Sequence, residues 1–175
     1  MSVSAPYDAN DWKKLVEEAN KQIKALRSGQ ASEEAMQKAR ELLSSLGLTD
    51  AQVDEVIREA QGLEAVLVPP LMMRMRFIKG AMFALKKAFW ATMSEVNPVN
   101  KDEAKESWRT LAGKMIEVAN KKAVDWNVEY DNVLARLQLC AVKSLTPGGT
   151  RFYPAMIFYE LYKISEKEAE KVSLK

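Results

Sequence analysis

Apolar residues recur at helical spacing over most of this 175-residue chain, and that periodicity constrains the fold more than any other feature of the sequence. Within residues 1–62 it forms three stripes, each with its own start or stop signal. Ser28-Gly29 ends the first stripe, Ser32 caps the second, and Thr49 begins the capping box of the third. We therefore predict three amphipathic helices in this part of the chain.

Residues 63–70 are apolar and end in two prolines, which disfavour helix in the residue that precedes each of them. We expect a buried extended connector here. Pro70 suits the first turn of a helix, and Asn97-Pro98 is a strong stop signal, so the next helix is predicted over residues 71–96. A fifth helix is predicted from Asn100 towards residues 125–127.

The last third of the chain also reads as helical. Residues 133–145 are apolar on nearly every side, which is typical of a central buried helix. Residues 146–150 are expected to form a loop, and Pro154 to open a last helix. Because strand signals are nearly absent and the connections are short, we predict an all-α antiparallel helical bundle of six or seven helices. An acidic N-terminal helical segment (1–62) would then pack on a main bundle (71–175) across the connector (63–70).

The composition excludes most catalytic chemistries. The chain has no histidine and one cysteine, Cys140, so imidazole metal sites and Ser/His/Asp or Cys/His nucleophile systems are excluded, and no internal disulfide can form. Glycine-rich nucleotide-binding loops and the Ser-x-x-Lys arrangement are missing as well. We expect a protein that is not an enzyme, holds no cofactor or metal, and has Cys140 in its core.

Charge is divided unevenly along the chain, although the total is only +2. Residues 1–64 carry 8 basic and 12 acidic side chains, and residues 65–100 carry 5 basic and 1 acidic. In the predicted helix 71–96, all five cations precede the single acid, Glu95. This distribution favours an oriented contact surface.

A helical projection of residues 71–96 separates an apolar side, with Leu71, Ile78, Leu85 and Phe89, from a side that groups cations with aromatic rings. Cations can neutralise phosphates, and the rings between them can stack on bases. Arg74 points within the apolar side, where its stem can pack over the core edge. We predict a nucleic-acid-binding site, for DNA or RNA without sequence preference, formed by Arg74, Arg76, Lys79, Phe83, Lys86, Lys87 and Trp90.

Other interpretations stay open at this point. The same helix face suits a helical adaptor or regulatory subunit that binds an acidic protein partner, or a helix at a membrane surface. The acidic group Asp102, Glu103 and Glu106 could serve an enzyme that uses carboxylates alone, although acids at a helix start also complement its dipole. Residues 147–151 could present backbone N–H groups and a guanidinium to a phosphate, although an ordinary loop is favoured.

Aromatic residues cluster near the end of the sequence, and tyrosine and phenylalanine are enriched at subunit interfaces. The candidate interface residues are Phe152, Tyr153, Tyr159 and Tyr162. With the basic face, they predict a non-enzymatic, self-assembling nucleic-acid-binding protein of the nucleoprotein or helical coat-subunit type. No apolar run approaches the roughly 20 residues of a transmembrane helix, and the first residues lack a secretory signal, so we expect the cytoplasm or a virion.

Overall fold

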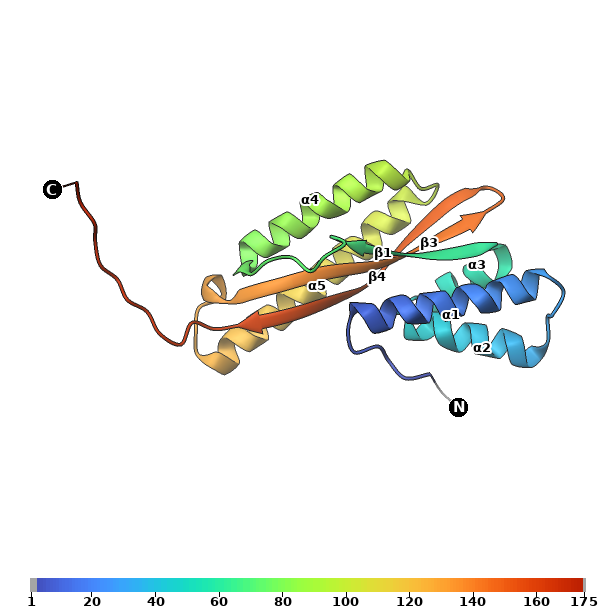
Figure 1. Cartoon of the computed structure of the whole chain (residues 1–175), viewed down its shortest axis with the longest axis horizontal. Helices are drawn as coiled ribbons and strands as arrows, with labels where there is room; N and C mark the ends of the chain where they lie inside the picture. The colour runs from blue at the N-terminus through green and yellow to red at the C-terminus, as the bar shows by residue number, and fades with distance from the viewer. Residues whose placement is uncertain (1–2, 175) are drawn as a thin grey trace.

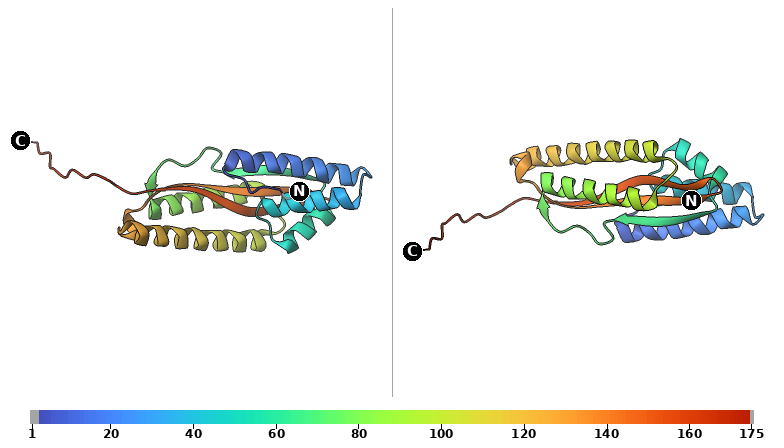
Figure 2. Two further views of the ribbon diagram at one scale, coloured as in Figure 1. Left: turned by 90° about the horizontal axis from the view of Figure 1, so that it is seen from below. Right: turned by 90° about the horizontal axis from the view of Figure 1, so that it is seen from above.

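The structure is a computed structural model that describes residues 3–174. Its elements lie in two helical layers with an antiparallel sheet between them (Figures 1 and 2). In chain order the elements are α1 (Ala9–Arg27), α2 (Glu33–Ser45), α3 (Asp50–Glu59), β1 (Gly62–Val68), β2 (Arg76–Phe77), α4 (Ile78–Val96), α5 (Lys101–Trp126), the 3-10 turn η1 (Tyr130–Asn132), β3 (Leu134–Thr146) and β4 (Gly149–Tyr162).

The three N-terminal helices form where the sequence predicts them, because their capping residues make the expected hydrogen bonds. Ser32 accepts a bond from the backbone of Ala35, and Thr49 and Gln52 form a complete capping box at the start of α3. The apolar stripe of α1 is buried throughout, at Trp12, Val16, Ala19, Ile23 and Leu26.

Strand β3 is the centre of the sheet. Along one side it pairs with β4 over its whole length, and the two strands form a long hairpin. Along its other side it pairs with β1 from Gly62↔Leu145 to Val68↔Leu139, and then with the short β2 at Arg76↔Ala135 and Phe77↔Leu134. A bulge in β4 shifts the register by one residue next to Pro154.

Helices pack on both faces of the sheet, so the strands are buried on two sides where the two helical layers overlap. We call the face that carries Cys140 and Tyr153 the front face, because α1 lies over it on the viewer's side of Figure 1. The back face carries Leu139 and Phe152 and packs against α4 and α5. The result is two separate apolar cores, one on each face, that share a single sheet.

The all-α prediction is therefore wrong: residues 3–174 form five α-helices and a four-stranded sheet. Residues 133–145, expected as a buried helix, are mostly β3, and the helix expected from Pro154 is the second half of β4. The physical reason is that a strand buried on both faces loses the polar–apolar alternation that marks a half-exposed strand. The expected helical bundle, with 71–175 as its main part, does not form.

The predicted helix 71–96 has its expected end but a later start. Asn97 adopts the left-handed conformation (φ +47°) that ends α4, whereas the helix begins only at Ile78. The segment before it runs alongside β3, where the backbone N–H of Met73 donates to Leu137 at 3.5 Å. The helical projection of residues 71–96 puts Leu71 on the apolar side, but Leu71 precedes the helix and is exposed.

Candidate nucleic-acid interface

Helix α4 lies on the back face of the sheet with one side turned to solvent. Ile78, Leu85 and Phe89 are buried against the sheet and α5, and the ring of Phe89 stacks on Trp108 with a centroid distance of 5.1 Å. This packing fixes the rotation of α4 about its axis. The residues on its opposite side must then face water, as their helical spacing predicts.

The solvent side of α4 carries two aromatic rings among lysines. Phe83 is 63% exposed and Trp90 is 39% exposed, which is unusual for side chains of this size. The ammonium of Lys87 lies 5.6 Å from the ring centroid of Phe83, and that of Lys105, from α5, lies 5.4 Å from the ring of Trp90. Each ring therefore has a cation beside it. We call Lys79, Phe83, Lys86, Lys87 and Trp90 the α4 outer face.

The two arginines of the predicted site are not on the helix. Arg76 is in β2 and Arg74 is in the irregular segment before it, and both are exposed close to the first turn of α4. Lys79 forms an exposed ion pair with Asp131 at 3.0 Å. Exposed pairs of this kind contribute about 1 kcal/mol or less, so a phosphate can compete for the lysine.

The sequence did not reveal Lys105 as a neighbour of the α4 outer face. Its contact with Trp90 depends on how α5 packs beside α4, and spacing along either helix does not encode that packing. Lys105 adds a fourth lysine to the three that α4 carries. The one acid of α4, Glu95, is at the end of the helix.

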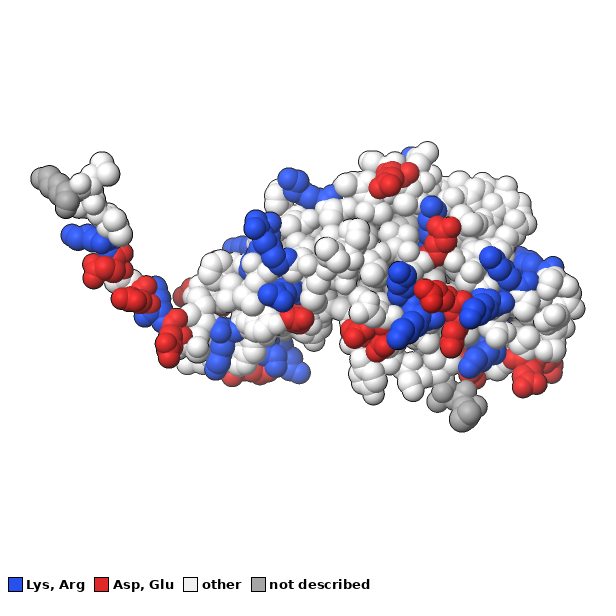
Figure 3. Space-filling model, in the orientation of Figure 1, with Lys and Arg blue, Asp and Glu red and all other residues white. Residues whose placement is uncertain are grey.

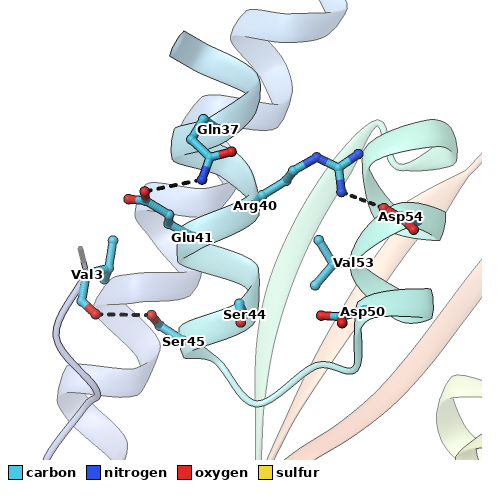
Figure 4. Close-up of a pocket in the computed structure, with 9 residues that line it drawn as sticks. All are labelled: Val3, Gln37, Arg40, Glu41, Ser44, Ser45, Asp50, Val53 and Asp54. Atoms are coloured by element: carbon cyan, nitrogen blue, oxygen red, sulfur yellow. Dashed lines mark hydrogen bonds and ion pairs between the residues drawn. The ribbon is translucent and has the colours of Figure 1, made fainter. Parts of the chain in front are cut away.

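In two surface clefts elsewhere, the main charged side chains of the lining bind other protein groups. The cleft of about 530 Å³ between α2 and α3 is bridged by an ion pair of Arg40 with Asp54 at 2.5 Å (Figure 4). On its far side, Gln37 donates to Glu41. These side chains bind one another across or beside the opening, and they do not converge on a common point where a ligand could sit.

A second cleft, of about 490 Å³, lies at the turn between β3 and β4 and is lined by three arginines. Arg27 donates to the backbone carbonyls of Ile57 and Ala60, at the end of α3. Arg151 lies 3.0 Å from the carboxylate of Glu55 and 3.3 Å from that of Glu59. The guanidinium of Arg151, which the sequence suggested as a phosphate ligand, therefore binds two glutamates. The loop expected at residues 146–150 is the turn of the β3–β4 hairpin.

Glu55 also accepts a hydrogen bond from the hydroxyl of Tyr153, a contact that the sequence did not predict because it joins α3 to β4. Burial, and then this hydrogen bond, raise the pKa of Tyr153 well above its ordinary value. Burial alone raises the pKa of the Cys140 thiol to about 12, and Cys140 lies in the core as predicted. Neither group is poised for proton transfer or nucleophilic attack near neutral pH.

The acidic group at the start of α5 has structural contacts. Glu103 accepts hydrogen bonds from Asn100 at 2.8 Å and from Gln52 of α3 at 3.4 Å, so it ties two helices together. Glu106 pairs with Arg109, and Asp102 is exposed in the first turn. Among the residues that the structure describes, no group of three or more acidic or cysteine side chains could hold a metal ion.

The four aromatic residues proposed as an interface separate into two pairs. Phe152 and Tyr153 are fully buried, one in the core of each sheet face. Tyr159 and Tyr162 are exposed near the end of β4, on opposite faces of the sheet, since their partners on β3 are Leu137 and Leu134. Only the second pair is at the surface of the described chain.

These features define a mixed α/β protein that presents a basic aromatic helix on its surface. Compared with protein-family models, with curated proteins and with solved structures, the chain shows no significant match. Within residues 3–174, none of the helices is long and apolar enough to cross a membrane.

Proposed function

We propose that this protein is a non-enzymatic nucleic-acid-binding protein that holds the phosphate backbone against the α4 outer face. One observation carries the proposal: Phe83 and Trp90 are exposed among lysines on a helix whose only acid, Glu95, lies at its end. A structural surface helix mixes both signs of charge and exposes few large rings. Here the rings offer stacking surfaces and the lysines offer countercharge.

The dimensions of the face support contact with several phosphates. Lys79 and Trp90 are eleven residues apart, which is about 16 Å along a helix at 1.5 Å per residue. Arg74 and Arg76 extend the positive charge beyond the first turn of α4. A nucleic-acid strand that runs along α4 meets Lys79 first, then Phe83, then Lys86 and Lys87, and finally Trp90.

The proposal is tested by a salt titration of binding. Labelled duplex DNA and RNA and their single strands are titrated with the protein by fluorescence anisotropy, from low salt to about 200 mM. The double variant Lys86→Gln/Lys87→Gln should weaken binding and reduce the slope of log K against log salt by about 0.9 for each lysine removed on duplex. Its matched control is Lys13→Gln/Lys14→Gln, which removes two adjacent exposed lysines from α1.

Two results would contradict the proposal. One is the absence of binding to any of these nucleic acids at low salt. The other is an equal loss in the α1 and α4 double variants, because that result reflects total charge and not the α4 outer face. If α4 instead binds an acidic protein surface, the alternative that the sequence left open, the protein should not bind these nucleic acids at low salt.

A further inference from the structure

The front face of the sheet is covered at one end only. Helices α1–α3 pack over the part that contains Cys140, Val142 and Tyr153, and Figure 2 shows these helices at one end of the molecule. Beyond this part, β2, β3 and β4 place Phe77, Leu134 and Tyr162 in one row across the front face, since Phe77 and Tyr162 both pair with Leu134. We call this row and the neighbouring Arg136 the open sheet end.

Both aromatic rings of this row reach solvent. Phe77 is 48% exposed and Tyr162 is 36% exposed. The segment that leads into β2 adds exposed apolar side chains, at Leu71, Met72 and Met75. A group of exposed apolar residues as large as this one marks a contact surface in a soluble domain.

The charges around the open sheet end have mainly one sign. Arg136 occupies the next row of the front face, and Lys163 follows the end of β4. Arg74 and Arg76 precede Phe77 in the sequence, and Arg76 lies on the back face because its partner on β3 is Ala135. All four cations are exposed. Glu160 pairs with Arg136 across the strands, and its carboxylate accepts a hydrogen bond from the hydroxyl of Tyr162. In Figure 3, which shows the front side, basic side chains outnumber acidic ones on the left part of the folded body, whereas the C-terminal tail and the surface of α1 and α2 mix both signs.

This charge pattern selects among possible occupants. A second copy packed on the open sheet end would bring Arg74, Arg136 and Lys163 of both copies into one interface, and an excess of like charge there opposes association. An anionic partner has no such penalty. The exposed rings further favour a partner with flat faces that can stack.

We infer that the open sheet end binds single-stranded nucleic acid, with bases stacked on Phe77 and Tyr162 and phosphates near Arg136. The inference rests on the proposed function and adds the form of the ligand. In a duplex the base faces are covered by their neighbours, whereas the bases of a single strand can be spread over a sheet surface. The α4 outer face then supplies countercharge to either form, and the open sheet end distinguishes between them.

The test compares single strands with duplexes of the same sequence, by anisotropy at fixed salt. Phe77→Ala and Tyr162→Ala should each lower the affinity for a mixed-sequence single strand by roughly 5- to 100-fold, the range reported by alanine substitution of stacking residues, and change duplex affinity less than twofold. Tyr159→Ala is the matched control. Tyr159 is on the same strand at 46% exposure, but on the back face, so its loss should leave both affinities unchanged.

A conservative variant separates stacking from folding. Phe77→Leu keeps apolar bulk in the row without an aromatic face, so it should melt at the wild-type temperature and still lose single-strand affinity. Wild-type single-strand affinity in both Phe77→Leu and Phe77→Ala would overturn the inference. A wild-type dimer in sedimentation that Phe77→Ala converts to monomers would also overturn it, because the occupant would then be a second copy.

The lysine variants distinguish a failure of this inference from a failure of the proposed function. If Lys86→Gln/Lys87→Gln weakens binding to both forms while the Phe77 and Tyr162 variants change nothing, the proposed function stands and the inference fails. If the lysine variant changes nothing while the Phe77 and Tyr162 variants lose single strands selectively, the open sheet end is the binding site and the α4 outer face is not.

Discussion

Gly47 lies where the end of α2 contacts β4, and its substitution gives a quantitative test of the fold. It follows the end of α2 with φ +102°, in the region that residues with a Cβ rarely adopt. A Cβ at this position would lie 2.5 Å from the backbone oxygen of Ala155, beside the bulge of β4. Neither backbone can move aside easily, because α2 is anchored in the front core and β4 in the sheet.

The expected loss combines two effects. A left-handed backbone costs a residue with a Cβ about 1–2 kcal/mol. Forcing a methyl group into a packed contact adds about 1–3 kcal/mol. Gly47→Ala should therefore lower the free energy of unfolding by about 2–5 kcal/mol. In a domain of this size each kcal/mol lowers the melting temperature by about 2–4 °C.

Gly29→Ala is the matched control, since Gly29 has φ +94° at the end of α1 but no atom within 4 Å of the added Cβ. It carries the backbone cost alone. Urea denaturation of both variants and the wild type measures the two losses, and the difference between them reports the contact with Ala155. Equal losses in the two variants would refute the close approach of α2 to the β4 bulge.

Two further predictions concern buried groups. Stability should fall as the pH rises from about 9 towards 12, because the Cys140 thiol ionises near its ordinary pKa of 9.0 in the unfolded chain but only near pH 12 in the folded one. Ionisation of this group in the unfolded chain lowers the free energy of unfolding by about 1.4 kcal/mol per pH unit. Cys140→Ala should therefore show a shallower decline in urea titrations. Equal slopes in the variant and the wild type would contradict the burial of Cys140. Asn100→Ala should cost about 2–4 kcal/mol and accelerate hydrogen exchange at the Phe152 amide, because the Asn100 amide bonds both the N–H and the C=O of Phe152 at the edge of β4. Unchanged exchange at that amide would exclude this role.

The N-terminal helices could be predicted from the sequence because the information that defines them is local. The capping side chains of Ser32 and Thr49 bond to backbone groups three residues away, and the stripe of α1 repeats within one helix. Neither signal depends on the rest of the fold. The same is true of the end of α4 at Asn97, which needs only a left-handed residue before a proline.

The hairpin of β3 and β4 could not be read in this way. Leu139 and Ala141 enter the back core while Cys140 and Val142 enter the front core, so successive residues are all apolar and no period of two remains. Pro154 added to the error, because proline often opens a helix. In the structure it lies in β4, which forms an edge of the sheet where a missing N–H is tolerated.

The two surfaces differ in how far the sequence determines them. Phe83, Lys87 and Trp90 share a side of α4 because of helical spacing alone, so their grouping could be predicted. Phe77 and Tyr162 are far apart in the sequence and meet across Leu134 through strand register. Register depends on which residues of distant strands face the same core, and composition does not specify it.

The order of elements along the chain has a consequence for how the molecule is made. Both cores use side chains of β3 and β4, yet these strands follow all five helices in the sequence. During synthesis the helices emerge with their apolar sides uncovered, and the surface that joins them arrives last. The hairpin then closes both layers at once, so neither half of the protein reaches its native packing before the other. Contacts this distant in sequence slow folding, and they make the final hairpin the step at which the nascent chain is most exposed to aggregation.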